Sequence, residues 1–146
     1  MDTLNDISTD MVKRHRVRAD VSGTTATLLL VRENVILTAN IGDSVALIGR
    51  LYEGAWYYKI LSADHTPNSS SEKERLETRG ATVSAGHGAR NKIIEIPGTA
   101  VSHITSTRTL GDKLATKYGI ISTPEIRQHT IFHDEMFVVV ATSGIW

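Results

Sequence analysis

The spacing of apolar residues changes along the chain from a helical period to a strand period. Near the N-terminus Leu4, Ile7 and Met11 recur every three or four residues, which predicts an amphipathic helix within residues 4–15. Four short runs rich in β-branched and aromatic residues then follow one another between polar or glycine-containing turns, at 25–31, 35–41, 44–51 and 56–61. Closely spaced strands of this kind predict an antiparallel meander.

The second half of the chain begins with a polar stretch typical of a helix. A helix is predicted over residues 70–79, with Gly80 as its C-terminal stop. Serines followed three residues later by glutamate offer a capping box at its start (Ser69/Glu72 and Ser71/Glu74). A further helix is predicted from about residue 110, ending at Gly119.

Short strand patterns fill most of the remaining sequence. Two are predicted near 92–96 and 100–104, and residues 125–132 alternate weakly between apolar and polar positions. Residues 135–144 form a strand with a continuous apolar centre, which is typical of a strand covered on both faces. These patterns together predict an α+β fold with mostly antiparallel strands.

Composition narrows the class of protein. The 146 residues carry 16 basic and 16 acidic side chains, a formal net charge of zero, which argues against binding to nucleic acid or to an anionic membrane surface. With 40% hydrophobic and 22% charged residues the sequence is typical of a soluble globular protein. It has neither an apolar run long enough to span a membrane nor an N-terminal signal pattern. Cysteine is absent, which favours a cytoplasmic or nuclear location.

Six short motifs occur in a particular order along the chain. They are Ser22–Ala26, Ala39–Ser44, Leu61–Pro67 with Glu72, Arg75, Leu76 and Gly80 after it, Ser106–Lys113, Thr123–Ile126, and Asp134–Phe137 leading to Ala141–Trp146. Each motif alone is common, but their order and spacing resemble the metal-dependent protein serine/threonine phosphatases of type 2C, the PPM-type phosphatase family. The resemblance covers about residues 20–146 and around half of a complete family domain.

The resemblance implies a fold and a chemistry. The expected fold is a four-layer α-β-β-α sandwich of two antiparallel sheets, with a binuclear Mn²⁺ or Mg²⁺ centre at one end. The expected reaction is hydrolysis of phosphoserine and phosphothreonine in a phosphoprotein substrate, by a hydroxide that the metal ions generate at neutral pH. Such hard cations prefer carboxylate and water oxygens.

Two departures from the family pattern bear on activity. Ser143 stands where the family has a metal-binding aspartate, and a neutral hydroxyl cannot supply the charge of a carboxylate. The family's early Asp-Gly-His-Gly segment and its late Asp-Asn ligand do not occur in residues 1–146, so we expect a partial domain without its N-terminal and C-terminal parts. Asp43 remains as the metal ligand and resembles the residue that serves a third, weakly held ion; no catalytic residue is assigned.

Two functions follow from these departures. The first is a metal-dependent serine/threonine phosphatase that is incomplete and weak or inactive in this chain. The second is a non-catalytic pseudophosphatase fragment that acts as a protein-binding module, which Ser143 favours. Asp43 also has a purely structural interpretation, because Gly-Asp-Ser is an ordinary turn sequence.

Other polar side chains have structural interpretations beside chemical ones. We expect Asp64 and His65 to form a hydrogen-bonded corner before the helix, and Arg108 and Asp112 to serve in packing or ion pairs. The glycine-rich loop around His87 lacks the Gly-Lys-Ser/Thr that a phosphate-binding loop requires, so we interpret it as a surface loop.

The remaining candidates are two histidines and an aromatic run. His129 and His133 stand four apart, which suits a zinc pair only on a helix, and their strand-like surroundings place them at separate sites. The aromatic run 56–58 is interpreted as strand packing and not as a platform for stacked bases.

Overall fold

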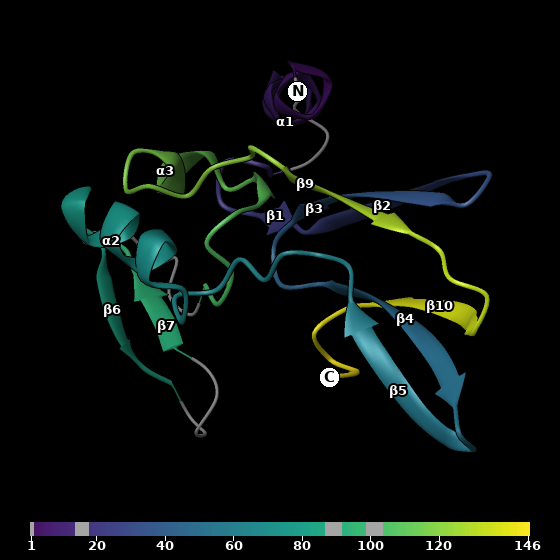
Figure 1. The fold of residues 1–146 in the computed structure, drawn as a ribbon. Helices are drawn as coiled ribbons and strands as arrows, with labels where there is room; N and C mark the ends of the chain where they lie inside the picture. The colour runs from purple at the N-terminus through teal and green to yellow at the C-terminus, as the bar shows by residue number, and fades with distance from the viewer. Residues whose placement is uncertain (1, 14–17, 87–91, 99–103) are drawn as a thin grey trace.

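The computed structural model describes residues 2–13, 18–86, 92–98 and 104–146, and its sheets and helices are drawn in Figure 1. The elements are α1 (Asp2–Lys13), β1 (Gly23–Thr24), β2 (Ala26–Arg32), β3 (Val35–Ile41), β4 (Val45–Tyr52), β5 (Ala55–Ile60), α2 (Ser70–Thr78), β6 (Thr82–Ala85), β7 (Lys92–Glu95), β8 (Leu110–Gly111), α3 (Lys113–Thr116), β9 (Glu125–Thr130) and β10 (Glu135–Ala141). None of the helices in these ranges is long and apolar enough to cross a membrane.

Two three-stranded antiparallel sheets form the larger part of the fold. One has the strand order β2-β3-β9 and the other β10-β4-β5, and they lie one above the other in Figure 1. The predicted meander is therefore wrong in its pairing. β2 pairs with β3 and β4 pairs with β5, but the chain crosses from one sheet to the other between β3 and β4. The predicted α+β class with two antiparallel sheets is confirmed.

The core between the two sheets is small and aliphatic. Ile36 from β3 meets Ala46 and Ile48 from β4, and Leu61 joins them just after β5. Ala46 and Ile48 are two residues apart on β4 and therefore lie on the same face of the strand, the face that meets this core. These contacts hold the crossover between β3 and β4 in place, which matters because it carries Asp43.

A second core lies beside the sandwich, where α2, α3 and the β6-β7 hairpin come together on the left of Figure 1. Leu76 from α2 is fully buried there. Its buried neighbours come from β6, β7, α3 and the segments next to them (Ala81, Ile94, Ile96, Ala115 and Ile120). The predicted helix over 70–79 is confirmed within one residue, and Gly80 follows it with φ +85°.

Three predictions about elements need correction. The helix predicted over 110–119 is a single turn, Lys113–Thr116, because Leu110 and Gly111 form β8, and Gly111 and Asp112 before the helix have positive φ. β10 is not covered on both faces: it lies at the edge of its sheet, and Met136–Val140 are exposed. Ser69 makes no side-chain capping hydrogen bond, so the capping box is wrong as well.

Two further sequence predictions fall partly outside the described residues. The strand expected near 100–104 is described only at Ile104, which forms a single bridge to Ile94 of β7. The loop around His87 lies outside the described residues.

Candidate metal-binding pocket

Asp43 lies in the turn through which the chain passes from the first sheet to the second. Gly42 before it has φ +104°, and a Cβ at that position would lie 2.3 Å from Cγ2 of Thr25. Only glycine satisfies both the backbone conformation and the space. The Gly-Asp turn is therefore a fixed structural feature that presents the Asp43 side chain at the junction of the sheets.

Two buried side chains hold this turn in position. The Asn40 amide nitrogen donates to the carbonyl oxygens of Gly42 at 2.9 Å and Ala63 at 2.6 Å. The Gly42 N–H donates to Nδ1 of His65 at 3.2 Å. The backbone N–H of His65 in turn donates to the Gly42 carbonyl at 3.2 Å. The hydrogen-bonded corner predicted around Asp64 and His65 is thus confirmed for His65, and its role is to support the turn that carries Asp43.

His65 is buried in its neutral form. Burial lowers the pKa of its imidazole, and the nearby Arg108 guanidinium lowers it further. A neutral ring with an unprotonated Nδ1 is what the hydrogen bond from Gly42 requires. Nε2 lies 3.6 Å from the Glu125 carboxylate and forms no hydrogen bond with any described residue.

Asp43 and Ser143 line the same pocket. This pocket has a volume of about 310 Å³ and collects residues from five separate segments of the chain. Its other lining residues are Thr66, Pro67, Asn68, Lys92, Thr105, Gly144 and Trp146. The structure therefore brings together the one expected metal ligand and the serine that replaces a second one, although they are 100 residues apart in sequence.

A basic side chain also reaches this pocket. Lys92 at the start of β7 donates from Nζ to the Pro67 carbonyl at 3.4 Å. An ammonium group in the pocket attracts an anion and opposes a cation, so it acts against metal binding and in favour of a phosphate group.

The described donors do not by themselves fit a binuclear metal centre. Burial raises the pKa of Asp64, and the charge of Asp43 raises it further, so the two carboxylates influence one another. Within residues 2–13, 18–86, 92–98 and 104–146, however, no group of three or more histidine, aspartate or glutamate side chains is placed to hold a metal ion. Two divalent ions need more carboxylate oxygens than Asp43 and Asp64 provide.

A buried ion network fixes the loop that carries Thr107 and Arg108. Glu72 of α2 accepts two hydrogen bonds of 2.7 Å from Arg75 and one of 2.7 Å from Arg108, and the Thr107 hydroxyl also donates to it. Burial alone would raise the pKa of Glu72, but these hydrogen bonds outweigh it and hold the pKa well below its usual range. The ion-pair role predicted for Arg108 is confirmed.

The short β1-β8 pairing joins two of the sequence motifs. Gly23 faces Gly111, and a Cβ on Gly23 would lie 2.0 Å from Oδ2 of Asp112. Asp112 is itself buried, and burial raises the pKa of its carboxyl group. The glycine is needed because the Asp112 side chain occupies the space beside it, which supports the packing role predicted for Asp112.

His129 and His133 are separate, as the strand pattern predicts. His129 is buried on β9 and bonded through Nε2 to Glu135 at 2.8 Å, whereas His133 is exposed in the connection to β10. The structure thus gives no support to a zinc pair. Nor is the aromatic run 56–58 buried as strand packing would require, although the Trp56 ring does pack against Phe137 at 5.3 Å between centroids.

Sequence reasoning missed Lys92 and the grouping around it. Lys92 lies beside a glycine-rich stretch with no informative motif, so only the folded structure brings it to Asp43. The ion pairs of Glu72 were also missed, because its spacing from Ser69 indicated a helix cap. The Glu-x-x-Arg spacing of Glu72 and Arg75 on one helix face was the signal that could have identified the ion pair.

The sandwich, the Gly-Asp turn and the pocket at the sheet junction define the class of protein, and comparison with known proteins agrees. The family model described as Protein phosphatase 2C matches residues 2–146. The chain belongs to the protein phosphatase 2C family.

Curated relatives and solved structures resemble the chain over nearly all of its length. It is 33% identical over 127 residues to "Probable protein phosphatase 2C 61" of Arabidopsis thaliana, covering 86% of this chain and 39% of that protein. It is 30% identical over 151 residues to "Probable protein phosphatase 2C 34" of the same plant, covering 99% and 41%. The solved serine-threonine phosphatase 2C from Toxoplasma gondii shares its fold with a TM-score of 0.80 at 19% identity, covering 99% of this chain and 49% of that one. The chain thus spans about two fifths of the length of these curated relatives.

Proposed function

We propose that this chain forms part of a metal-dependent protein serine/threonine phosphatase domain that acts on phosphoproteins, with weak or absent hydrolysis in the chain itself. The observation that carries the proposal is that Asp43 and Ser143 line one pocket. Asp43 would contact a weakly held Mn²⁺ or Mg²⁺, whose chemistry in this family is to activate a water molecule. The cysteine-free sequence supports a cytoplasmic or nuclear location, and its zero net charge argues against nucleic acid as a partner.

Ser143 is the reason to expect weak activity. A serine hydroxyl is neutral and offers one oxygen, whereas the aspartate expected there offers a negative charge and two oxygens. Lys92 adds a positive charge to the same pocket. Asp43 therefore lacks a second carboxylate at position 143, just after β10, and the affinity of the pocket for a metal ion should be low.

The test is to restore the carboxylate. A Ser143→Asp variant should bind Mn²⁺ about tenfold more tightly than the wild type, because a second carboxylate adds about 1.4 kcal/mol or more to the binding of a divalent ion. Mn²⁺ binding is measured by loss of the free-ion electron paramagnetic resonance signal. Hydrolysis of an aryl phosphate and a phosphothreonine peptide is measured beside it, with EDTA as control.

Two further variants make the result specific. Asp43→Ala should abolish the gain seen with Ser143→Asp, whereas Ser71→Asp, which adds the same charge on exposed α2, should leave Mn²⁺ affinity unchanged. Equal gains from the two aspartate variants would contradict a metal site at this pocket. Manganese-dependent turnover by the wild type that Asp43→Ala removes would contradict the proposal that hydrolysis is weak.

The alternative is a non-catalytic pseudophosphatase that binds partner proteins. Ser143 favours it because the substitution lies within a motif. Two results together would support this alternative. The chain would bind a phosphothreonine peptide equally well with and without EDTA, and it would not hydrolyse that peptide even at about millimolar Mn²⁺.

A further inference from the structure

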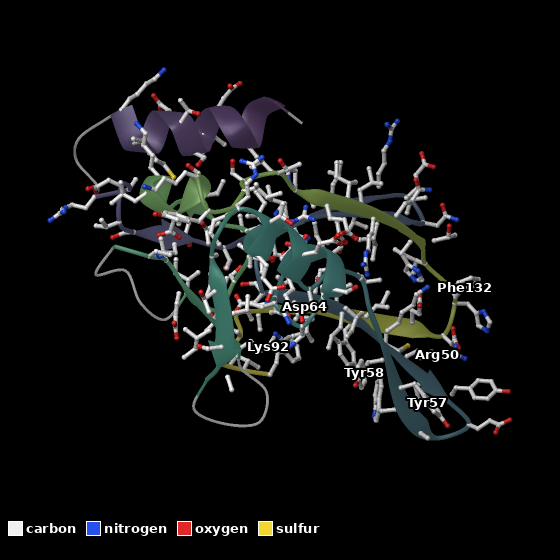
Figure 2. The ribbon with its side chains drawn as sticks, turned by 90° about the vertical axis from the view of Figure 1, so that its left-hand side faces the viewer. Arg50, Tyr57, Tyr58, Asp64, Lys92 and Phe132 are labelled. Atoms are coloured by element: carbon white, nitrogen blue, oxygen red, sulfur yellow. The ribbon has the colours of Figure 1, made fainter. Side chains whose placement is uncertain are left out.

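A second groove lies at the opposite end of the sandwich from helix α2. It is formed by β4, β5 and the connection from β9 to β10, and its volume is about 460 Å³. We call it the β5 groove; its lining residues are Arg50, Tyr52, Tyr57, Tyr58, Lys59, His129, Phe132 and Glu135. Figure 2 shows the labelled Arg50, Tyr57, Tyr58 and Phe132 gathered there. Among the described residues, its lining and that of the Asp43 pocket have no member in common.

The exposed charged side chains that line the β5 groove, Arg50 and Lys59, are cationic. Arg50 binds Asp134 through Nη2 at 2.9 Å and lies over the Tyr52 ring at 5.2 Å; its Nε is buried, but the side chain as a whole is 42% exposed. Lys59 is exposed and uses its ammonium group to donate to Nδ1 of His129 at 3.3 Å. An ammonium group has three donors, so two remain for a ligand.

The acidic group of the β5 groove is enclosed. The Glu135 side chain is 4% exposed and accepts hydrogen bonds from His129 Nε2 at 2.8 Å and from the Phe132 N–H at 2.9 Å. Because Lys59 donates to Nδ1 of His129, the ring proton is on Nε2 and faces Glu135. A ligand in the groove therefore meets the Lys59 and Arg50 donors and not the Glu135 carboxylate.

The strand that forms one wall can also accept a partner strand. β5 is at the edge of the sheet order β10-β4-β5, and all six of its residues are exposed. Every second backbone amide and carbonyl of an edge strand points away from its sheet and is available for pairing. A strand paired with β5 places alternate side chains on the face that holds Tyr57 and Lys59, within about 5 Å of them.

We propose that the β5 groove binds an extended acidic peptide segment of a partner protein, which pairs with β5 and places a carboxylate side chain between Lys59 and Arg50. The exposed tyrosines supply apolar contact for the residues beside that carboxylate. Tyr57 and Tyr58 are 54% and 70% exposed, and aromatic rings with a polar tip are typical of such contacts. Backbone pairing provides affinity in this mode of recognition, and the side-chain contacts provide specificity.

The first test changes the peptide and leaves the 146-residue chain intact. A fluorescein-labelled peptide of alternating valine and glutamate is titrated with the protein and followed by fluorescence anisotropy. A second peptide carries glutamine in place of each glutamate. We expect the glutamate peptide to bind more tightly by at least about tenfold, and to weaken as salt is raised, since accessible charges are screened. Equal binding of the two peptides, or no binding of either, would overturn the proposal.

The second test changes the protein. Lys59→Gln should weaken binding of the glutamate peptide by about threefold to fivefold, the range for one exposed ion pair. Lys117→Gln removes the same charge from the segment after α3 and serves as the matched control, which should leave binding unchanged. Equal losses from the two variants would mean that only net charge matters and would contradict a site at β5.

The third test concerns backbone pairing. Hydrogen exchange of the β5 amides should slow by at least about tenfold when the glutamate peptide is present at saturation, while exchange in α2 stays unchanged. Binding without any protection of residues 55–60 would show that the peptide does not pair with β5 and would overturn that part of the inference.

Discussion

Glu72 offers the sharpest test of how the fold holds its loops together. In the Glu72→Gln variant the side chain keeps its shape and one carbonyl oxygen, but it loses its charge. Arg75 and Arg108, both bonded to the carboxylate at 2.7 Å, would then lie beside one another with no anion between them. The Thr107 hydroxyl would lose a charged acceptor as well.

The magnitude follows from burial. The Glu72 side chain is 5% exposed, so water cannot replace the lost contacts, whereas Arg75 and Arg108 are 24% and 15% exposed and recover part of their hydration. Removing one partner of a buried ion pair costs about 3–5 kcal/mol, and the partial exposure of the arginines favours the lower end. We therefore expect Glu72→Gln to lower the free energy of unfolding by about 3 kcal/mol.

Chemical denaturation followed by circular dichroism measures this difference, with Glu74→Gln as the matched control. Glu74 is an exposed glutamate on the same helix, and its substitution should change the free energy of unfolding by less than about 0.5 kcal/mol. A loss below about 1 kcal/mol for Glu72→Gln would refute the argument, because it would mean that the arginines are satisfied without the carboxylate.

The same carboxylate makes the fold sensitive to acid. The pKa of Glu72 is lower in the folded protein than its ordinary value of 4.5, so the unfolded chain binds the proton more readily. Its stabilising contribution is therefore complete above about pH 4.5 and is lost as the pH falls below that value. The free energy of unfolding is measured from about pH 6 down to about pH 3, a range that includes the ordinary pKa of a carboxyl group. Over this range it should decline less for Glu72→Gln than for the wild type. Parallel curves would contradict the assignment.

Three further substitutions test the support of the Asp43 turn and the second core by chemical denaturation. Gly42→Ala should cost about 2 kcal/mol or more, because the residue has φ +104° and its Cβ would clash with Thr25; a neutral result would mean that the turn can relax. Asn40→Ala should cost about 2 kcal/mol, because it removes the side-chain donor to the Ala63 carbonyl and one of the two donors to the Gly42 carbonyl; an unchanged midpoint would contradict the importance of these bonds. Leu76→Ala should cost about 3–4 kcal/mol since Leu76 is fully buried, and a loss under about 1 kcal/mol would show that the second core collapses around the cavity.

Local patterns predicted the hairpins and α2 because their partners are close in sequence. The strands around Glu33 and Glu53 turn back at once, and both residues have the positive φ of tight turns. The motif around Asp43 was identified for the same reason, since its glycine, aspartate and serine are adjacent. What the pattern could not show is that the next strand crosses to another sheet, because alternation gives the buried face and not the pairing partner.

Contacts between residues far apart in the sequence account for the remaining differences between the predictions and the structure. The apolar run in β10 indicated a strand covered on both faces, but it lies at a sheet edge in this chain. Glu72 fits a capping box by spacing, and the two arginines that it binds offer a stronger interaction than the cap. Lys92 reaches the Asp43 pocket from a different hairpin, and no local sequence signal indicates that Lys92 and Asp43 line the same pocket.

The strand order also determines when each sheet can be completed while the chain is being synthesised. β9 pairs with β3 and β10 pairs with β4, so neither three-stranded sheet is complete until residues 125–141 have left the ribosome. About 65 residues separate the end of β5 from the start of β9. At about 5–20 residues per second, the two early hairpins would wait about 3–13 seconds with unpaired edges. Nascent chains of this protein should therefore depend on chaperones that bind extended apolar segments during that interval.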